Sequence, residues 1–355
     1  MDATLCHTRP VRASLRNRLK GRTVWRPIPA LIELAAERLL PETQALRMAY
    51  HTYYGFDRIA ARLLPRLRPD AVVGYENGAL EIFRAAKALG IPTILDAASV
   101  HHRLQTEAGL ADGDTPFRAN ANARKDAEIA LADHVLTCST LARDSYVAAG
   151  VAAERVHIVP LGFDAGIFAP GSDETHMGPV RLAFVGRFTR VKGVDVLADA
   201  IDRLAAQGLS FQLRLAADPA RDEAARDRLG RHGELLGKLP HDQLPALYRW
   251  ADALVLPSRF DSFGLVVLEA LACGLPVIVS DRVGAKDFVE HGVNGLILPS
   301  GDADALATSL AAFASDPAPL RAMRGAALAS ARDAEWTQYR TCAAATLGRI
   351  LDWPT

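Results

Sequence analysis

The 355-residue sequence has no excess of either charge and very few cysteines. Its 41 basic and 41 acidic residues give a formal net charge of zero, so the chain as a whole lacks the positive charge that draws proteins to nucleic acid. The four cysteines, Cys6, Cys138, Cys273 and Cys342, are far apart and include no Cys-x-x-Cys spacing. This pattern favours packed free thiols over a disulfide framework or a zinc site, and we therefore expect a reducing, cytoplasmic compartment.

Long apolar runs are also missing. No stretch of 18 apolar residues occurs, which excludes an obvious membrane-spanning helix, and the first 30 residues lack the apolar core of a signal peptide. These 30 residues instead carry seven Arg or Lys against a single acid, Asp2, and a helical pattern, ALIELAAERLL, follows at 30–40. The basic region is either the solvated face of an ordinary domain, which we favour, or a peripheral contact with an anionic membrane at its inner face.

What the sequence does contain is an alternation of strand-like and helix-like segments. Such alternation indicates parallel βαβ units, and it stops and restarts once, around a segment rich in Gly, Pro and acids. The predicted strands are 70–76, 92–98, 134–139 and 155–162 before that segment, and 180–186, 210–217, one near 235, 253–258, 276–281 and 295–299 after it. We therefore expect a first domain over 1–163, a linker over 164–179, a second domain over 180–330 and terminal helices over 331–355.

The stretch PSRFDSFGLVVLEALACGLP, at 257–276, contains a predicted buried helix from Gly264 to Cys273. Ser262 is placed to cap its start, and Glu269 is an acid among apolar residues, which is costly unless a polar or charged group meets it. Asp261 stands eight residues before Glu269, a separation of about 12 Å along a helix. The helix N-terminus between the two acids suits a diphosphate. The alternative is that Glu269 pairs with a structural arginine and Asp261 only caps a helix.

A second motif, VGRFTRVKGVDVL, follows the first strand of the second domain. Arg187 and Lys192 would lie in a βα loop at the carboxyl edge of the sheet, where ligands bind in such folds. Two cations there could neutralise a diphosphate. Basic residues are also common in exposed loops, so this motif alone is weak.

Together the two motifs resemble those of the retaining group 1 (family 4) glycosyltransferases, with Asp261 in place of the first Glu of their Glu-x7-Glu signature. The resemblance implies an α/β protein with a GT-B-like fold, in which two Rossmann-type parallel-sheet domains face each other across a cleft. It extends over about 57–355 and is strong over 132–299. Nothing before residue 57 resembles the family's opening strand and Gly-rich loop, so we expect an N-terminus that is either truncated or naturally atypical.

The resemblance also implies roles for individual residues. Glu269 would accept hydrogen bonds from the ribose, Asp261 from the sugar, and His102, slightly preferred over His101, would face the donor sugar. The candidate catalytic residues are Asp261, Arg187, Lys192 and His102, and those expected to bind the donor are Gly186, Arg187, Lys192, Lys238, Leu239, Ser262, Phe263, Gly264, Leu265 and Glu269. Glu76 and Asn77 are candidates for the acceptor side.

Three further positions bear on the donor. Gly284 and Ala285 would lie near it, and Asp287 stands where the family usually has Glu. The second strand of the second domain ends Ala216-Ala217 instead of Gly-x-Gly, which puts the contacts of that loop in doubt.

The function implied is the transfer of a sugar from a nucleotide diphosphate sugar to an acceptor hydroxyl, with retention and without a metal or other cofactor. The acceptor would be a carbohydrate, a lipid-linked molecule or a small molecule, and no nucleic acid is expected to bind. A catalytically inactive GT-B scaffold or regulatory protein is the main alternative, and a sugar-nucleotide epimerase is a weaker one. The sequence names neither the nucleotide, the sugar nor the acceptor.

Overall fold

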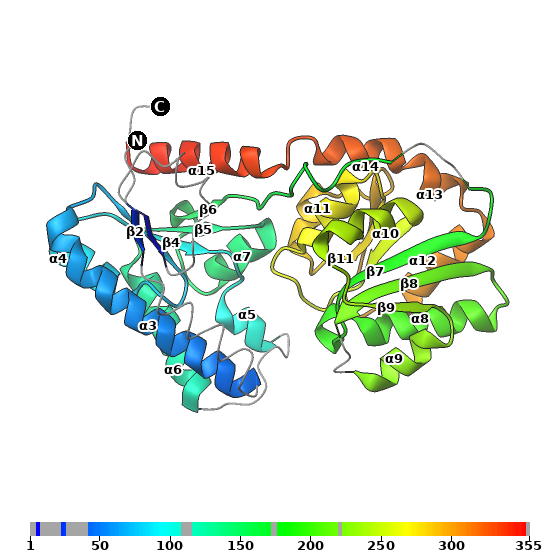
Figure 1. Cartoon of the computed structure of the whole chain (residues 1–355), viewed down its shortest axis with the longest axis horizontal. Coiled ribbons are helices and arrows are strands. Elements are labelled where there is room, and N and C mark those ends of the chain that lie inside the picture. The colour runs from blue at the N-terminus through cyan, green and yellow to red at the C-terminus, as the bar shows by residue number, and fades with distance from the viewer. Residues whose placement is uncertain are drawn as a thin grey trace.

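The computed structural model describes residues 5–7, 23–25, 42–107, 116–171, 176–218 and 222–352. Within them the chain forms two parallel sheets, each in its own α/β domain, which lie side by side in Figure 1. A further pair of short parallel strands, β1 (Leu5–His7) and β2 (Thr23–Trp25), makes a separate two-stranded sheet. The helix expected over 30–40 and most of the basic N-terminal region lie outside the described residues.

The first domain contains a four-stranded parallel sheet in the order β3-β4-β5-β6. Its strands are β3 (Val72–Tyr75), β4 (Thr93–Ala97), β5 (His134–Thr137) and β6 (Val156–Ile158). Its helices are α3 (Glu42–Leu67), α4 (Leu80–Ala88), α5 (His102–Glu107), α6 (Pro116–Leu131) and α7 (Thr140–Ala148), with a 3₁₀ turn η1 (Ala153–Arg155). The four predicted strands are therefore confirmed.

The second domain contains a six-stranded parallel sheet in the order β12-β11-β10-β7-β8-β9. Its strands are β7 (Val180–Arg187), β8 (Phe211–Asp218), β9 (Glu234–Gly237), β10 (Ala253–Leu256), β11 (Val277–Ser280) and β12 (Gly295–Leu298). The central strands β10 and β11 are buried at every position, because helices cover both faces of a parallel sheet. This is why they read as continuous apolar runs in the sequence.

The helices of the second domain connect these strands and then continue to the end of the described chain. They are α8 (Val194–Ala206), α9 (Glu223–Gly230), α10 (Leu244–Trp250), α11 (Leu265–Ala272), α12 (Ala303–Ser315), α13 (Ala318–Ala322), α14 (Arg324–Ala331) and α15 (Trp336–Ile350). Three 3₁₀ turns lie between them: η2 (Arg190–Lys192), η3 (His241–Gln243) and η4 (Gly284–Phe288).

Two first-domain helices were not predicted. α3 runs over 42–67, a segment for which we predicted no helix, and it packs on α4. α5 occupies part of the polar stretch after β4. The buried residues of α3 are Thr52, Asp57, Ala60 and Leu64, which recur at roughly helical spacing. Two of these four are polar, so the hydrophobic pattern alone does not mark the buried face of this helix.

The chain crosses between the domains twice, and the two crossings touch. Phe163 N donates to the carbonyl of Ala334 at 3.0 Å, and Trp336 N donates to the carbonyl of Phe163 at 3.1 Å. After the second crossing, α15 returns along the first domain, as Figure 1 shows at the top of the view. There its apolar side packs against Ile94, Leu136 and Val159 of the first sheet.

Candidate functional site

The candidate site is built at the point where the strand order of the second sheet reverses. β8 lies on one side of β7 and β10 on the other, so the chain leaving β7 and the chain leaving β10 diverge at the same edge. In open parallel sheets such a reversal opens a crevice at the carboxyl ends of the strands, where ligands bind. Arg187 ends β7, and Asp261 follows β10 by five residues.

Lys192 and Asp261 form an ion pair across this edge. Lys192 ends η2, and the next residue, Gly193, has φ 70°, a left-handed conformation that favours glycine. A Cβ on Gly193 would lie only 2.0 Å from the carbonyl oxygen of Pro257. The absence of a side chain at Gly193 is therefore what lets the β7 loop approach the end of β10 closely enough for the pair to form.

Backbone hydrogen bonds fix the loop that carries Asp261. Asp261 N donates to the carbonyl of Arg282 at 2.9 Å, and Gly284 N donates to the carbonyl of Asp261 at 3.0 Å. Ala285 N donates to the carbonyl of Phe263 at 2.6 Å. Gly284 and Ala285, which we expected near the donor, thus hold in place the loop over 257–264, called the signature loop below. The Asp261 carboxylate is therefore carried by a backbone that is fixed by hydrogen bonds.

The start of α11 differs from the prediction. The helix begins at Leu265, and its N-cap residue is Gly264 at φ 87°, with no side-chain cap. Ser262 lies too early in the chain to cap the helix, because the left-handed turn at Gly264 intervenes. The expectation that Ser262 caps α11 is therefore wrong, and the first N–H groups of the helix have no side-chain acceptor. Such groups, at the positive end of the helix dipole, can bind an anion.

Ser262 instead joins the two domains. Its Oγ accepts a hydrogen bond from Val100 N at 3.3 Å, and its carbonyl accepts one from Ser139 Oγ at 2.9 Å. Cys138 Sγ also approaches this carbonyl, at 3.4 Å. Val100 follows β4, and Cys138 and Ser139 follow β5. The carboxyl edge of the first sheet therefore faces the signature loop of the second.

Asp287 makes a second contact between the domains. Its carboxylate accepts hydrogen bonds from Thr140 N at 2.7 Å and Thr140 Oγ1 at 2.5 Å, at the first residue of α7. Beside it, a Cβ on Gly284 would collide with Ser139 and with the carbonyl of Ser262. Aspartate at 287 therefore reaches the first domain directly.

Glu269 is buried on α11, with 6% of its surface exposed. Tyr248 Oη donates to its Oε2 at 2.8 Å, and His241 Nε2 lies 3.2 Å from its Oε1. The polar partners of Glu269 are thus a tyrosine and a histidine, so the alternative that Glu269 pairs with a structural arginine is wrong. Asp261 pairs with Lys192 and does not cap α11, so the other half of that alternative is wrong as well.

The remaining donor candidates differ in how deeply they are buried. Gly186 is half-buried and Arg187 is exposed at the end of β7, Phe263 is buried, and Leu265 is 38% exposed. Lys238 and Leu239 follow β9 and immediately precede the turn that carries His241. Through His241 this segment lies close to Glu269, although β9 is the edge strand of the sheet.

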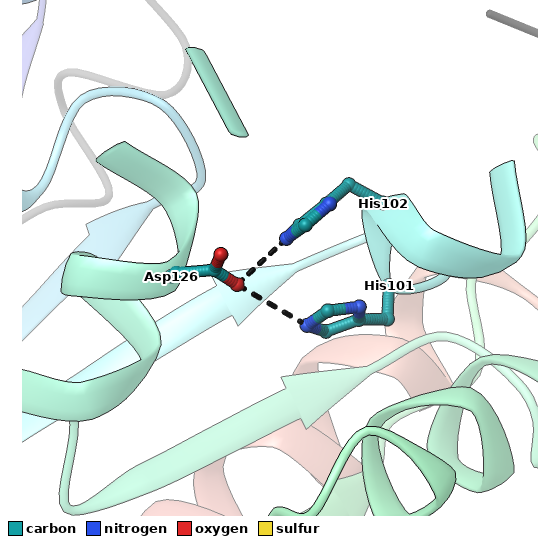
Figure 2. A group of neighbouring side chains, drawn as sticks. All are labelled: His101, His102 and Asp126. Atoms are coloured by element: carbon teal, nitrogen blue, oxygen red, sulfur yellow. Dashed lines mark hydrogen bonds and ion pairs between the residues drawn. The ribbon is translucent and has the colours of Figure 1, made fainter. Parts of the chain in front are cut away.

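His102 lies in the first domain, where it contacts Asp126. Its Nε2 is 2.7 Å from Asp126 Oδ1, and the Nε2 of His101 is 3.8 Å from the same oxygen. Figure 2 shows both rings pointing at this carboxylate from the start of α5, with Asp126 reaching over from α6. Both histidines are buried, and burial together with the neighbouring His102 ring lowers the pKa of His101 to about 4.

Two imidazoles and a carboxylate this close could in principle hold a metal ion. The hydrogen bonding argues against it. Arg103 N donates to Nδ1 of His101 at 3.3 Å, so the proton of the neutral ring belongs on Nε2, which faces Asp126. A metal at that place would need a free lone pair on Nε2. The geometry therefore fits a hydrogen-bonded triad that orients His102 better than it fits a metal centre.

The two acceptor-side candidates are held by first-domain groups. Glu76 pairs with buried Lys125 at 3.2 Å and accepts a hydrogen bond from Ser99 Oγ at 2.6 Å. Asn77 has φ 73°, and its backbone N–H donates to Glu128 at 2.8 Å. Glu76 is thus placed by two partners at the edge of the sheet, and Asn77 serves to turn the chain.

The described cysteines are free, as predicted. Cys138 and Cys273 are buried and Cys342 is half-buried. Burial raises the pKa of the Cys138 thiol to about 12 and that of Cys273 to about 11. Both therefore stay protonated at neutral pH and are unreactive.

Sequence reasoning missed several side chains that shape the site, namely Asp126, Phe168, His241 and Tyr248. His241 and Tyr248 lie 28 and 21 residues before Glu269. The only local signal was Glu269 itself, a buried acid that had to have partners. Nothing in the sequence indicated which residues those partners are.

Two family models match the chain. The "Glycosyl transferase 4-like domain" model matches residues 4–162, and the "Glycosyl transferases group 1" model matches residues 172–329. The first match begins well before residue 57, so our expectation that the resemblance starts there is wrong. Among the described residues, no helix is long and apolar enough to cross a membrane.

Curated relatives and solved structures agree with these matches. The D-inositol 3-phosphate glycosyltransferase 1 of Catenulispora acidiphila is 32% identical over 275 residues, which cover 71% of this chain and 65% of that protein. The glycogen synthase of Mycobacterium tuberculosis is 29% identical over 286 residues, covering 78% and 68%.

The fold itself matches that of Anabaena HepE in complex with UDP-glucose, with a TM-score of 0.68 and 18% identity over 98% of this chain and 99% of that one. The two parallel-sheet domains have the expected GT-B-like arrangement. The chain therefore belongs to the group 1 glycosyltransferases.

Proposed function

We propose that this protein transfers a sugar from a nucleotide diphosphate sugar to an acceptor hydroxyl, retaining the anomeric configuration and using no metal ion. The observation that carries the proposal is the Lys192–Asp261 ion pair, which lies where the strand order reverses and beside the uncapped start of α11. A cation, a carboxylate and a row of N–H groups suit a diphosphate joined to a sugar. The Anabaena neighbour with this fold is a complex with UDP-glucose.

Each group has one task in this proposal. Lys192 and Arg187 neutralise the diphosphate as the bond between the anomeric carbon and the phosphate oxygen breaks. Asp261 accepts hydrogen bonds from sugar hydroxyls. The acceptor oxygen bonds to the anomeric carbon on the face that the diphosphate leaves, and its proton passes to the departing phosphate oxygen. Such same-face transfer needs no protein nucleophile.

Aspartate at 261 is one methylene shorter than the family's glutamate. Backbone hydrogen bonds join Asp261 to residues 282 and 284, and in this proposal the loop position that they fix compensates for the shorter side chain. The Asp261 carboxylate already reaches Lys192, so a longer side chain at 261 would have to place its carboxylate elsewhere. Glutamate at 261 should therefore lower turnover.

Calorimetry with UDP tests the donor site. We expect micromolar to millimolar binding to the wild type, weakened about 10–100-fold in Lys192→Ala and Arg187→Ala, as for hydrogen bonds to charged groups. Lys87→Ala is the matched control, because Lys87 pairs with Asp133 on the first domain. Equal binding by all four proteins would contradict the proposal.

The chemistry can be tested without knowing the acceptor. Slow hydrolysis of UDP-glucose, followed by proton NMR before the sugar mutarotates, should release α-glucose and UDP in the presence of a metal chelator. The β-anomer would exclude retention, and loss of activity on chelation would exclude metal independence. Binding of UDP-glucose with no turnover, even when acceptor sugars are supplied, would favour the inactive scaffold.

A further inference from the structure

The carboxylate of Glu269 is contacted on both of its oxygens. Tyr248 Oη donates to Oε2 at 2.8 Å, and His241 Nε2 lies 3.2 Å from Oε1. A carboxylate offers about four acceptor positions, two on each oxygen. One donor on each oxygen leaves a second position on each, and two neighbouring hydroxyl groups can fill such a pair of positions together.

Tyr248 can only act as the donor in this contact. It is completely buried on α10, and burial together with the nearby Glu269 charge holds the pKa of its hydroxyl well above the ordinary value. The tyrosine therefore keeps its proton and directs it at Oε2. His241 approaches from the η3 turn with a side chain that is 55% exposed, so this second contact lies near the surface.

Phe168, in the segment that crosses between the domains, packs against both of these residues. Its ring lies edge-on to His241, with centroids 4.8 Å apart, and tilted against Tyr248 at 6.0 Å. Phe168 is 2% exposed, and the next residue's carbonyl accepts a hydrogen bond from Arg249 Nη1 at 3.4 Å. The interdomain segment is therefore attached to the same helix that positions Glu269.

We propose that Tyr248 and His241 are positioning residues that aim the two oxygens of Glu269 at the 2′ and 3′ hydroxyls of the donor's ribose, and that Phe168 holds both of them. The proposal rests on the proposed function, since it assumes a nucleoside diphosphate beside α11. It extends that function by naming the residues on which recognition of the ribose depends. It also connects the interdomain segment with ribose recognition.

The test compares UDP with 2′-deoxy-UDP by calorimetry on the full-length protein. The wild type should bind UDP at least tenfold more tightly than 2′-deoxy-UDP. Tyr248→Phe should weaken UDP binding about 5–20-fold and 2′-deoxy-UDP binding less than twofold, so that the ratio between them falls. Tyr146→Phe is the matched control, because Tyr146 is equally buried, in the first domain, and should leave the ratio unchanged.

Two further variants keep the test decisive if Tyr248→Phe folds poorly. His241→Leu should lower the ratio, and His241→Gln, whose amide can still donate near the position of Nε2, should restore most of it. Phe168→Leu should lower it by a smaller factor. A merely structural role would reduce the melting temperature and leave the ratio between the two nucleotides unchanged.

The possible outcomes distinguish a failure of this inference from a failure of the proposed function on which it rests. An unchanged ratio in both Tyr248→Phe and His241→Leu overturns the inference. Equal binding of UDP and 2′-deoxy-UDP by the wild type also overturns it, while leaving the diphosphate site at Lys192 intact. Failure of the wild type to bind UDP at all overturns the proposed function and the inference together.

Discussion

The two domains differ in the number of charged side chains that they bury and in how these side chains are grouped. Among the described residues of the first domain, Asp57, Glu76, Lys125 and Glu128 are all buried, together with the histidine pair of Figure 2. In the described part of the second domain the buried acids are Asp252, which pairs with Arg321, and Glu269. The first domain therefore buries a cluster of interacting charges, whereas the second buries two separate acids in a larger apolar core.

The contrast follows from how each sheet edge is assembled. In the first domain the turn after β3 is held by side chains from other helices. Asp57 of α3 accepts from Glu81 N at 2.7 Å, and Glu128 of α6 accepts from Ala79 N at 3.0 Å. Arg124 pairs with both acids. In the second domain the equivalent loops are held by backbone hydrogen bonds, which need no buried charge.

Removing Arg124 should give the largest effect. Arg124→Ala leaves Asp57 and Glu128 buried without a cation, so the free energy of unfolding should fall by about 3–5 kcal/mol. Urea denaturation followed by circular dichroism measures the loss. Arg143→Ala is the control, since the exposed Arg143–Asp144 pair should contribute less than about 1 kcal/mol.

The same variant tests whether the domains are independent. UDP affinity, measured where Arg124→Ala is still folded, should stay within about twofold of the wild type, because charge–charge effects on the second domain are screened over about 8–10 Å. A loss of UDP binding as large as that of Lys192→Ala would show that the donor site depends on the charges of the first domain.

Acid should weaken the first domain through His101. The pKa of this buried histidine falls from 6.5 to about 4, so between these values the unfolded chain binds a proton that the folded chain does not. The free energy of unfolding should therefore decrease as pH is lowered from 6.5 to 4, by about 3 kcal/mol from this group. His101→Gln should remove this contribution and leave the opposite one from Glu128, whose pKa burial raises from 4.5 to about 7.

The exposed histidine His51 provides the comparison for this experiment. His51→Gln should leave the slope between pH 6.5 and 4 unchanged. If His101→Gln also leaves this slope unchanged, other groups cause the acid sensitivity of the protein. Burial of His101 would then not contribute to the difference between the two domains.

The smallest expected effect is at the contact between the domains. Asp287→Ala removes the acceptor for Thr140 N and Oγ1, which should cost about 0.5–2 kcal/mol, as for a lost cap. Because these bonds join η4 to α7, small-angle scattering should show a slightly larger radius of gyration. Asp144→Ala, on the same helix and paired with its neighbour Arg143, should leave the radius unchanged.

The sequence predicted the second domain better than the first. The physical reason is that the residues that identify the second domain lie close to one another along the chain. Strands such as β10 and β11 are apolar at every position, and the two motifs lie next to strands that can be recognised. The Lys192–Asp261 pair follows from the topology once both motifs are placed. What failed was local detail: Ser262 looks like a helix cap until the left-handed turn at Gly264 is known.

In the first domain the informative contacts join residues distant in sequence. Asp57 and Arg124 are 67 positions apart, and Glu128 meets the turn at Asn77 across 51 positions. Their residue types are those of ordinary surface residues, so no pattern indicates that they are buried. The partners of Glu269 are hidden for the same reason.

The return of α15 to the first domain has a consequence for the order in which the protein is made. Ile94 and Leu136 belong to early strands and Val159 directly follows another, but the helix that covers them spans 336–350. During synthesis every strand of the second sheet leaves the ribosome before that helix does. The second domain can therefore finish folding first, while the earlier-made domain waits with part of an apolar face exposed, a state in which chaperones bind and aggregation begins.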